Sequence, residues 1–337
     1  MELKNATPFA IAHFALFDKD GAENIVVVIK ATYEIVGATP RIAEEQDPVR
    51  PADEYVGEPG KSGLIAEAEL VPPRPSTGVT LKGHAIAPAP DTRGMEVSLE
   101  VGGLAQRALV FGDRAWTSTL GLHGVSGPLP FERIPLTWEN AFGGVDHSAS
   151  KVKHHEAEEF NPAGKGFLAR NSAKKIGGLA LPNIEDPARR LRGPKDRPPP
   201  IGFLPVAPAW MPRRQYAGTY AEAWQNRRAP LLPDDFDERF HQAAPQNLTA
   251  PGRLEGGTPC RLKGVTPGGE SSFALPAESP LLKLRFPGAG IGIGCALDNV
   301  HFDTDRMRLN LIWRGIQQVH GRLDALQAIE VRLDTPP

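Results

Sequence analysis

The sequence MEVSLEVGGLAQRALVF, residues 95–111, decides the fold class predicted for this chain. In its first half apolar and polar residues alternate, which is the period of a half-buried strand. The pair Gly102-Gly103 then allows a tight turn, and a second alternating run follows as far as Phe111. This is the clearest hairpin in the sequence, and it indicates a mainly β fold built from antiparallel strands.

Further strands are predicted on both sides of this hairpin. Residues 24–36 (NIVVVIKATYEIV) are dense in β-branched residues and predict a buried strand. The links between the later apolar runs are too short for a parallel crossover, so we expect antiparallel pairing. These runs are residues 260–265, 271–275, 281–286, 296–302, 307–314 and 329–333.

The middle of the chain has a different character. Residues 146–249 are rich in Pro and Gly, and only short helices are expected there. We therefore predict two antiparallel β-rich, sandwich-like units, residues 1–145 and 250–337, joined by this partly irregular middle. Two units also agree with the usual size of about 150 residues per domain.

One part of this middle, residues 205–245, has the strongest helical signals. Thr219 followed by Glu222 has the spacing of a capping box, in which both side chains bond free backbone N–H groups at a helix start. A helix over residues 220–228 is predicted to follow, ended by a proline two residues later. A second short helical turn is expected around residues 235–240.

The same segment concentrates aromatic residues and arginines, the mixture found at the centres of protein interfaces. Two interpretations follow from this composition. The segment forms a binding surface for another protein, or its aromatic residues fill the space between the two β-rich units while the arginines form a solvated rim. The predicted protein-binding residues are Trp210, Arg213, Arg214, Tyr216, Tyr220, Trp224, Arg227 and Arg228.

Composition excludes several classes of protein. Lys and Arg number 38 against 40 Asp and Glu, so the chain lacks the positive charge that holds nucleic acid. Cys260 and Cys295 are too far apart for a redox or metal pair, and we expect two reduced thiols. There is no persuasive signal peptide and no apolar stretch of about 18 residues, so a cytoplasmic protein without a membrane partner is expected.

No motif predicts catalysis, a metal or a cofactor. The acidic and histidine-rich run at 154–159 lacks the H-E-x-x-H spacing and favours a solvated charged stretch. Gly164-Lys165-Gly166 lacks the rest of a phosphate-binding loop, and the alternating glycines at 288–294 favour close packing over ligand binding. Scattered histidines, including His241 and His301, have no partner at a catalytic spacing.

Five stretches together resemble a bacterial accessory family of type VI secretion, the domain of unknown function 2169. They are PLTWENAFGG (Pro135–Gly144), NPAGKGF (Asn161–Phe167), LPNIEDP (Leu181–Pro187), the segment at 205–245, and LDNVHFDTDRMRLNLIWRG (Leu297–Gly315). The resemblance covers nearly the whole chain. It implies a non-catalytic adaptor or chaperone that binds a PAAR-containing effector or the spike tip and helps load the effector onto the secretion spike.

Two alternatives stay open on the sequence. A hydrolase would use converging titratable groups in the polar region 146–200. A structural component of the secretion particle would self-associate and stay incorporated, whereas an adaptor captures its partner transiently.

Overall fold

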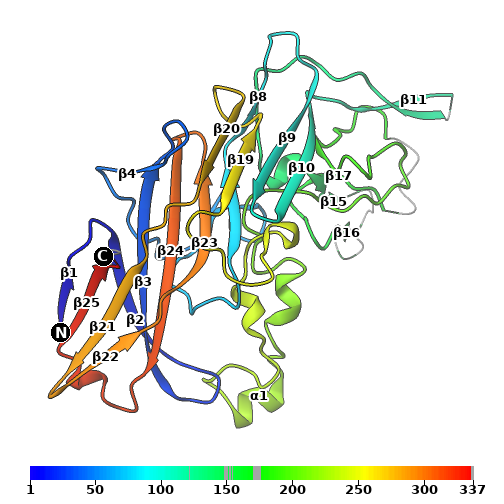
Figure 1. Cartoon of the computed structure of the whole chain (residues 1–337). Helices are drawn as coiled ribbons and strands as arrows, with labels where there is room; N and C mark the ends of the chain where they lie inside the picture. The colour runs from blue at the N-terminus through cyan, green and yellow to red at the C-terminus, as the bar shows by residue number, and fades with distance from the viewer. Residues whose placement is uncertain (121, 148–150, 152, 154, 170–175, 335–337) are drawn as a thin grey trace.

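The computed structural model describes residues 1–334 except 121, 148–150, 152, 154 and 170–175. The described chain is mainly β, as predicted, and its strands form several sheets (Figure 1). The hairpin at 95–111 is confirmed: β9 (Gly94–Val101) and β10 (Leu104–Phe111) pair from Val101 opposite Leu104 to Gly94 opposite Phe111. Gly102 has φ +58° at its turn, a conformation that favours glycine.

Three larger sheets carry most of the strands. The six-stranded sheet has the order β2 (Ala10–Phe17), β3 (Glu23–Glu34), β24 (Arg308–Gln318), β23 (Ala296–Asp303) and β7 (Gly78–Lys82), with β4 (Arg41–Ile42) also on β3. The five-stranded sheet is β18 (Ile184–Glu185), β10, β9, β19 (Pro259–Lys263) and β20 (Glu270–Ala274). The four-stranded sheet is β1 (Glu2–Asn5), β25 (Ala328–Leu333), β21 (Pro280–Phe286) and β22 (Ala289–Ile293).

Shorter strands form two-stranded pairs in addition to these sheets. They are β5 (Glu54–Tyr55) with β6 (Leu64–Ala66), β8 (His84–Ile86) with β13 (Arg133–Pro135), β11 (Trp116–Thr119) with β12 (Leu122–Val125), β14 (Phe142–Gly143) with β17 (Lys165–Gly166), and β15 (Val145–Asp146) with β16 (Glu156–Ala157). Regular structure in the described part of 146–200 is therefore sparse, as expected.

Strands from the two ends of the chain share the same sheets. β24 pairs with β3 along its whole length, from Arg308 opposite Glu34 to Gln318 opposite Asn24, and β19 pairs with β9. The ranges 1–145 and 250–337 therefore interleave and contribute to one large hydrophobic cluster. The alternation of apolar and polar residues identifies individual strands, but it does not predict which strands pair with each other.

The expectation of antiparallel pairing throughout is wrong in three places. β1 pairs with β25, β7 with β23 and β14 with β17 in parallel. The rule on short links applies to consecutive strands, whereas these partners are separated by at least one other strand. Parallel pairing then needs no dedicated crossover between them.

The two faces of the six-stranded sheet differ in what covers them. One face of β24 carries Leu309, Leu311 and Trp313, which belong to the main core. This core also contains residues of the other two larger sheets, and the four-stranded sheet approaches so closely that a Cβ at Gly315 would lie 2.8 Å from Leu282. The opposite face of β24 carries Arg308, Asn310 and other polar residues, as the alternation predicts.

Helices are short and concentrated in the segment after residue 205. They are η3 (Arg213–Tyr216), α1 (Glu222–Arg227), η4 (Glu238–His241) and η5 (Gln246–Leu248), with η1 (Trp138–Asn140) and η6 (Leu323–Ala325) elsewhere. In the described parts of the chain, no helix has the length and apolarity needed to span a membrane. Figure 1 shows α1 protruding beside the turn between β2 and β3, at the lower end of the six-stranded sheet.

Candidate functional site

The segment around α1 folds much as predicted, but its helix start differs. The helix covers Glu222–Arg227, inside the expected range, and Phe236 and Phe240 lie with ring centroids 5.8 Å apart. The predicted capping box is wrong, because the residue before the helix is Ala221 and no side chain caps it. The Thr219 hydroxyl instead donates to Asp235 at 2.6 Å, across the loop.

Two of the eight predicted binding residues are part of the interior. Trp210 is 2% exposed and packs edge-on against Trp138, with ring centroids 6.2 Å apart. Arg213 is 9% exposed and donates to the backbone carbonyls of Val206 and Phe240. Trp210 thus agrees with the interpretation that the aromatic residues pack in the interior, whereas Arg213 is buried and is not part of a solvated rim.

The other six predicted residues lie at the surface or close to it. Arg214 is exposed and pairs with Glu159, and the Arg239 guanidinium lies 4.3 Å from the centroid of the Tyr216 ring. The rings of Tyr220 and Trp224 pack edge-on, with their centroids 4.8 Å apart. The structure thus groups Tyr220, Trp224, Arg227 and Arg228 on one protruding element, which we call the lobe (residues 219–235).

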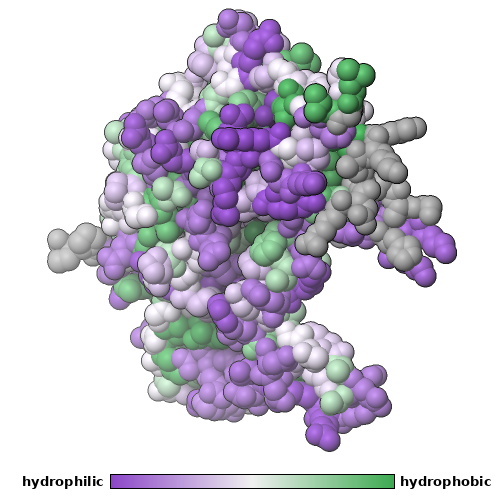
Figure 2. All heavy atoms as spheres, turned by 90° about the vertical axis from the view of Figure 1, so that its right-hand side faces the viewer, coloured by the Kyte–Doolittle hydropathy of each residue, from purple (hydrophilic) through white to green (hydrophobic). Residues whose placement is uncertain are grey.

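An apolar groove separates the lobe from the six-stranded sheet. It has a volume of about 720 Å³ and lies between the β2 end of the sheet and residues 230–232 of the lobe, with prolines 72, 73 and 75 at one side. Figure 2 shows apolar residues gathered on the lower part of the face that carries the lobe. The apolar lining includes Phe14, Leu16, Phe17, Leu231, Leu232 and Ile316.

Part of the groove lining is exposed to a degree unusual for large apolar side chains. Phe17 is 62% exposed and Ile316 is 39% exposed. A contiguous apolar surface of this kind typically marks a protein or ligand contact. The groove was missed by the sequence analysis because its walls come from four separate stretches of the chain.

Polar contacts hold the lobe against the turn between β2 and β3. The Arg228 guanidinium donates to the carbonyls of Lys19 and Leu232, and it pairs with Asp234 at 2.7 Å. The Trp224 indole N–H donates to the carbonyl of Leu231 at 2.8 Å. Hydrogen bonds from Trp224 and Arg228 therefore fix the backbone of Leu231 and Leu232, which form this wall of the groove.

Four ionisable groups that line the groove have shifted pKa values. Burial, together with the cations Arg74, Arg213 and Arg314, lowers the pKa of His241 to about 4, so this histidine is neutral at pH 7. Burial raises the pKa of Glu238, so both of these shifts favour the neutral forms. A hydrogen bond from the Ala22 backbone N–H lowers the pKa of Asp18. Burial alone would lower the pKa of Arg74, but the Glu67 carboxylate raises it, so the shifts of Asp18 and Arg74 favour the charged forms.

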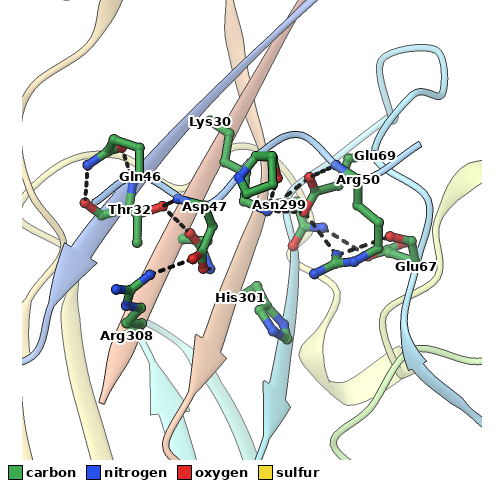
Figure 3. Close-up of polar contacts among 12 residues, drawn as sticks. Lys30, Thr32, Gln46, Asp47, Arg50, Glu67, Glu69, Asn299, His301 and Arg308 are labelled. Carbon is green, nitrogen blue, oxygen red and sulfur yellow. Dashed lines mark hydrogen bonds and ion pairs between the residues drawn. The ribbon is translucent and has the colours of Figure 1, made fainter. Parts of the chain in front are cut away.

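A second site on the same face of the sheet is polar and largely buried (Figure 3). Residues 46–69 lie across the face of the sheet that carries Lys30, and they form hydrogen bonds and an ion pair with residues of β3. The Lys30 ammonium lies 2.8 Å from Glu69 and also donates to the carbonyl of Pro48. Burial lowers the pKa of Lys30, although the charge of Glu69 opposes the shift.

Further contacts connect this cover to the strands from the C-terminal half. Arg314 is fully buried, pairs with Asp298 of the neighbouring strand, and donates to the Glu69 carbonyl of the cover at 2.8 Å. Arg74 forms a two-pronged pair with Glu67, which also accepts a hydrogen bond from Asn299 at 2.9 Å. These contacts join distant parts of the chain and indicate a structural role for the network.

The polar region also closes the edge of β3 where β2 has ended. The Gln46 side chain accepts from the Thr32 backbone N–H at 2.8 Å and donates to the Thr32 carbonyl at 3.0 Å, as a neighbouring strand would. Asp47 accepts hydrogen bonds from Arg306 and Arg308. Burial alone would raise the pKa of Asp47, but these partners lower it.

A small cavity of about 300 Å³ lies within the polar region and is lined by His301. The Nδ1 atom of His301 lies 2.9 Å from the Thr80 hydroxyl. Burial, with the nearby charges of Arg50, Lys30 and Lys82, lowers the pKa of His301 to about 3. A buried histidine at this position was not singled out by its sequence context.

The remaining motifs noted in the sequence have structural roles in the part of the chain that the structure describes. Lys165 donates to Asn140 at 3.0 Å, and burial lowers its pKa. Both cysteines are free thiols, and burial raises the pKa of each to about 12. His154 of the predicted charged run lies outside the described residues. Within the described ranges no group of three or more His, Cys, Asp or Glu is placed to hold a metal ion.

Comparison with known proteins places the chain among bacterial proteins. The model of a family described as an uncharacterized protein conserved in bacteria (DUF2169) matches residues 20–314. No curated protein and no solved structure matches the chain.

Proposed function

This chain belongs to the DUF2169 family, and from that premise we propose that it is a non-catalytic adaptor of type VI secretion. In this role it binds a PAAR-containing effector, or the spike tip, and assists loading of the effector onto the secretion spike. The five stretches quoted above, which resemble the accessory family, support the biological setting of this proposal.

The observation that carries the binding role is the apolar groove beside the lobe. Its lining is largely apolar, burial favours the neutral forms of His241 and Glu238 beside it, and Phe17 is exposed in its lining. Asp18, Lys19 and Arg74 add charged groups to this lining. The lobe whose residues 230–232 form one wall also carries aromatic residues and arginines, a composition enriched in protein interfaces. The proposed contact therefore combines a buried apolar centre with a polar rim.

Co-purification tests this function. The full chain, tagged, is co-expressed with a PAAR-bearing effector from the same bacterium, and the complex is sized by light scattering. We expect a one-to-one complex that Phe17→Asp weakens, because the new carboxylate enters the apolar groove. Leu129→Asp is the matched control, since Leu129 is 58% exposed but lies away from the groove.

The outcomes separate the adaptor from its alternatives. Equal capture by the Phe17 and Leu129 variants would remove the groove from the contact, and failure to capture any PAAR-bearing or spike protein would remove the adaptor role. Stable self-association, with incorporation into the secretion particle, would identify a structural component.

A further inference from the structure

Strand β2 forms one edge of the six-stranded sheet. Among the described strands it pairs with β3 alone, with Ala10 opposite Lys30 and Phe17 opposite Glu23. Its sequence AIAHFALF contains no proline and no residue with a permanent charge. Exposed apolar edge strands are normally blunted by such residues or covered, because they pair readily with other chains.

The hydrogen-bonding direction of each β2 residue follows from the register. The Asp18 N–H donates to the Ala22 carbonyl at 3.0 Å, so the even-numbered residues of β2 bond to β3. Consistently, the Glu23 carbonyl, opposite Phe17, accepts from Val319 on the other side of β3. The backbone groups of the odd-numbered residues therefore point away from the sheet.

These outward groups belong to Ile11, His13, Ala15 and Phe17. Within the described residues no backbone or side-chain hydrogen bond reaches their N–H or C=O groups. Three of the four residues, His13, Ala15 and Phe17, are exposed. The edge therefore offers an unused ladder of donors and acceptors at strand spacing.

Two cavities flank this edge, one on each face of the sheet. The apolar groove lies on the face of Phe14 and Leu16. On the opposite face a second cavity of about 490 Å³ lies beside His13 and Ala15 and is bordered by Leu326 and other apolar residues. A strand added to β2 would direct alternate side chains into the two cavities, because successive side chains point to opposite faces.

We propose that β2 accepts an extended segment of the partner protein as an additional strand, with apolar side chains filling both cavities. In this mode of recognition, main-chain hydrogen bonds supply affinity and the pockets for alternate side chains supply specificity. That the donor is the PAAR-bearing effector or spike protein rests on the proposed function, whereas the open edge and its two cavities do not.

The occupant is a partner segment and not a second copy of this chain. In a pairing of β2 with β2, the cavity beside His13 would receive another His13 and Ala15 from the second copy. An imidazole and a methyl group are too small to fill a cavity of about 490 Å³. A strand with larger apolar side chains at successive positions presents them on both faces and fits both cavities.

A synthetic peptide tests the edge without a natural partner. The peptide is as long as β2, carries leucine or valine at successive central positions so that both of its faces are apolar, and ends in lysine at both ends. We expect it to bind the full chain and to slow amide hydrogen exchange of His13 and Ala15, resolved by NMR, by about tenfold or more. The same peptide with alternate backbone amides methylated is the control, because it keeps the side chains and loses the donors.

Variants at one position test the backbone contact. Ala15→Pro removes an outward N–H and leaves the bonds to β3 in place, which edge strands tolerate. We expect it to weaken peptide binding about tenfold, while Ala15→Val, which keeps the N–H, binds as the natural chain does. If Ala15→Pro lowers thermal stability markedly, Leu231→Asp in the opposite wall of the groove takes its place.

Each result decides one point. Binding without protection of His13 and Ala15, or equal binding of the methylated peptide, overturns the strand-addition proposal. A dimer of the free chain that Ala15→Pro converts to a monomer also overturns it, because a second copy then covers the edge. Protection by the peptide without capture of a PAAR-bearing protein upholds the accepting edge and rejects the proposed function.

Discussion

One face of the six-stranded sheet is covered in two different ways, and the difference separates a closed region from an open one. Around Lys30 and Arg314 the face carries buried charged side chains: Lys30 pairs with Glu69 of the covering segment, and Arg314 pairs with Asp298 of the sheet and donates to the Glu69 carbonyl. Around Phe14 and Leu16, the same face is apolar and faces the groove. The polar region is closed from within the chain, whereas the apolar region and the edge beside it are left open.

The largest expected effect is in the polar region. Asp298→Asn leaves the Arg314 guanidinium buried without its counter-charge, and breaking a buried pair in this way costs about 3–5 kcal/mol of stability. Chemical denaturation measures the loss. The control is Glu270→Gln, which breaks a solvent-exposed pair with Arg261 and should cost far less, because water and salt screen this pair. Equal costs for the two variants would contradict a closed polar region.

Acid should also act on the polar region. The pKa of His301 is about 3 in the folded chain against an ordinary value of 6.5, so the unfolded chain binds this proton more readily. Its contribution to stability is complete above pH 6.5 and is lost as the pH falls towards 3. Between these values His301→Gln should reduce the slope of the unfolding free energy by about 1.4 kcal/mol per pH unit.

The slope, and not the stability at one pH, is the measurement for this variant, since His301→Gln also changes the bond to Thr80. His241→Gln should likewise reduce the slope, over the narrower range from about 4 to 6.5. An unchanged slope in His301→Gln would show that this imidazole is not buried as a neutral group.

In the open region, the lobe should respond locally. Arg228→Ala removes the ties to Lys19 and Asp234, and we expect amide exchange in residues 222–232 to quicken by roughly tenfold, equivalent to about 1.4 kcal/mol. Exchange in β3 should not change. Arg227→Ala is the matched control, because it removes the neighbouring arginine, which is exposed and makes neither of these contacts. Faster exchange throughout the sheet would contradict a locally held lobe.

The smallest effect is expected at the rim of the groove. Phe17→Ser should change the free energy of unfolding by less than about 0.5 kcal/mol, because the ring is 62% exposed and contributes little to the folded chain alone. Thermal or chemical denaturation of the free protein measures this. A loss above about 1.5 kcal/mol would place Phe17 in the core and weaken the contrast between the two regions.

The sequence predicted individual strands well because their signals are local. Alternation identified residues 95–111, and β-branched residues identified 24–36, within a few positions of β9, β10 and β3. Strand partners could not be read in this way, since β3 pairs with β24 from the other end of the chain.

The candidate site was predicted only in part. The segment at 205–245 does form one wall of the groove, but Trp210 and Arg213 are buried. Aromatic residues and arginine occur in cores as well as in interfaces, so composition does not distinguish the two. The capping box was wrong because Asp235, distant in sequence from Thr219, competes for its hydroxyl.

The pairing of β3 with β24 has a consequence for how the protein is made. The hydrogen-bonded residues Thr32 and Asn310 are 278 residues apart in the sequence. During synthesis, β3 therefore remains without its partner β24 until most of the chain has been made. At about 5–20 residues per second this delay is roughly 15–60 s. During this time β7, whose sheet partner is β23, also has an unpaired edge. A nascent chain of this protein therefore exposes the edges of β3 and β7 until β23 and β24 have been synthesised.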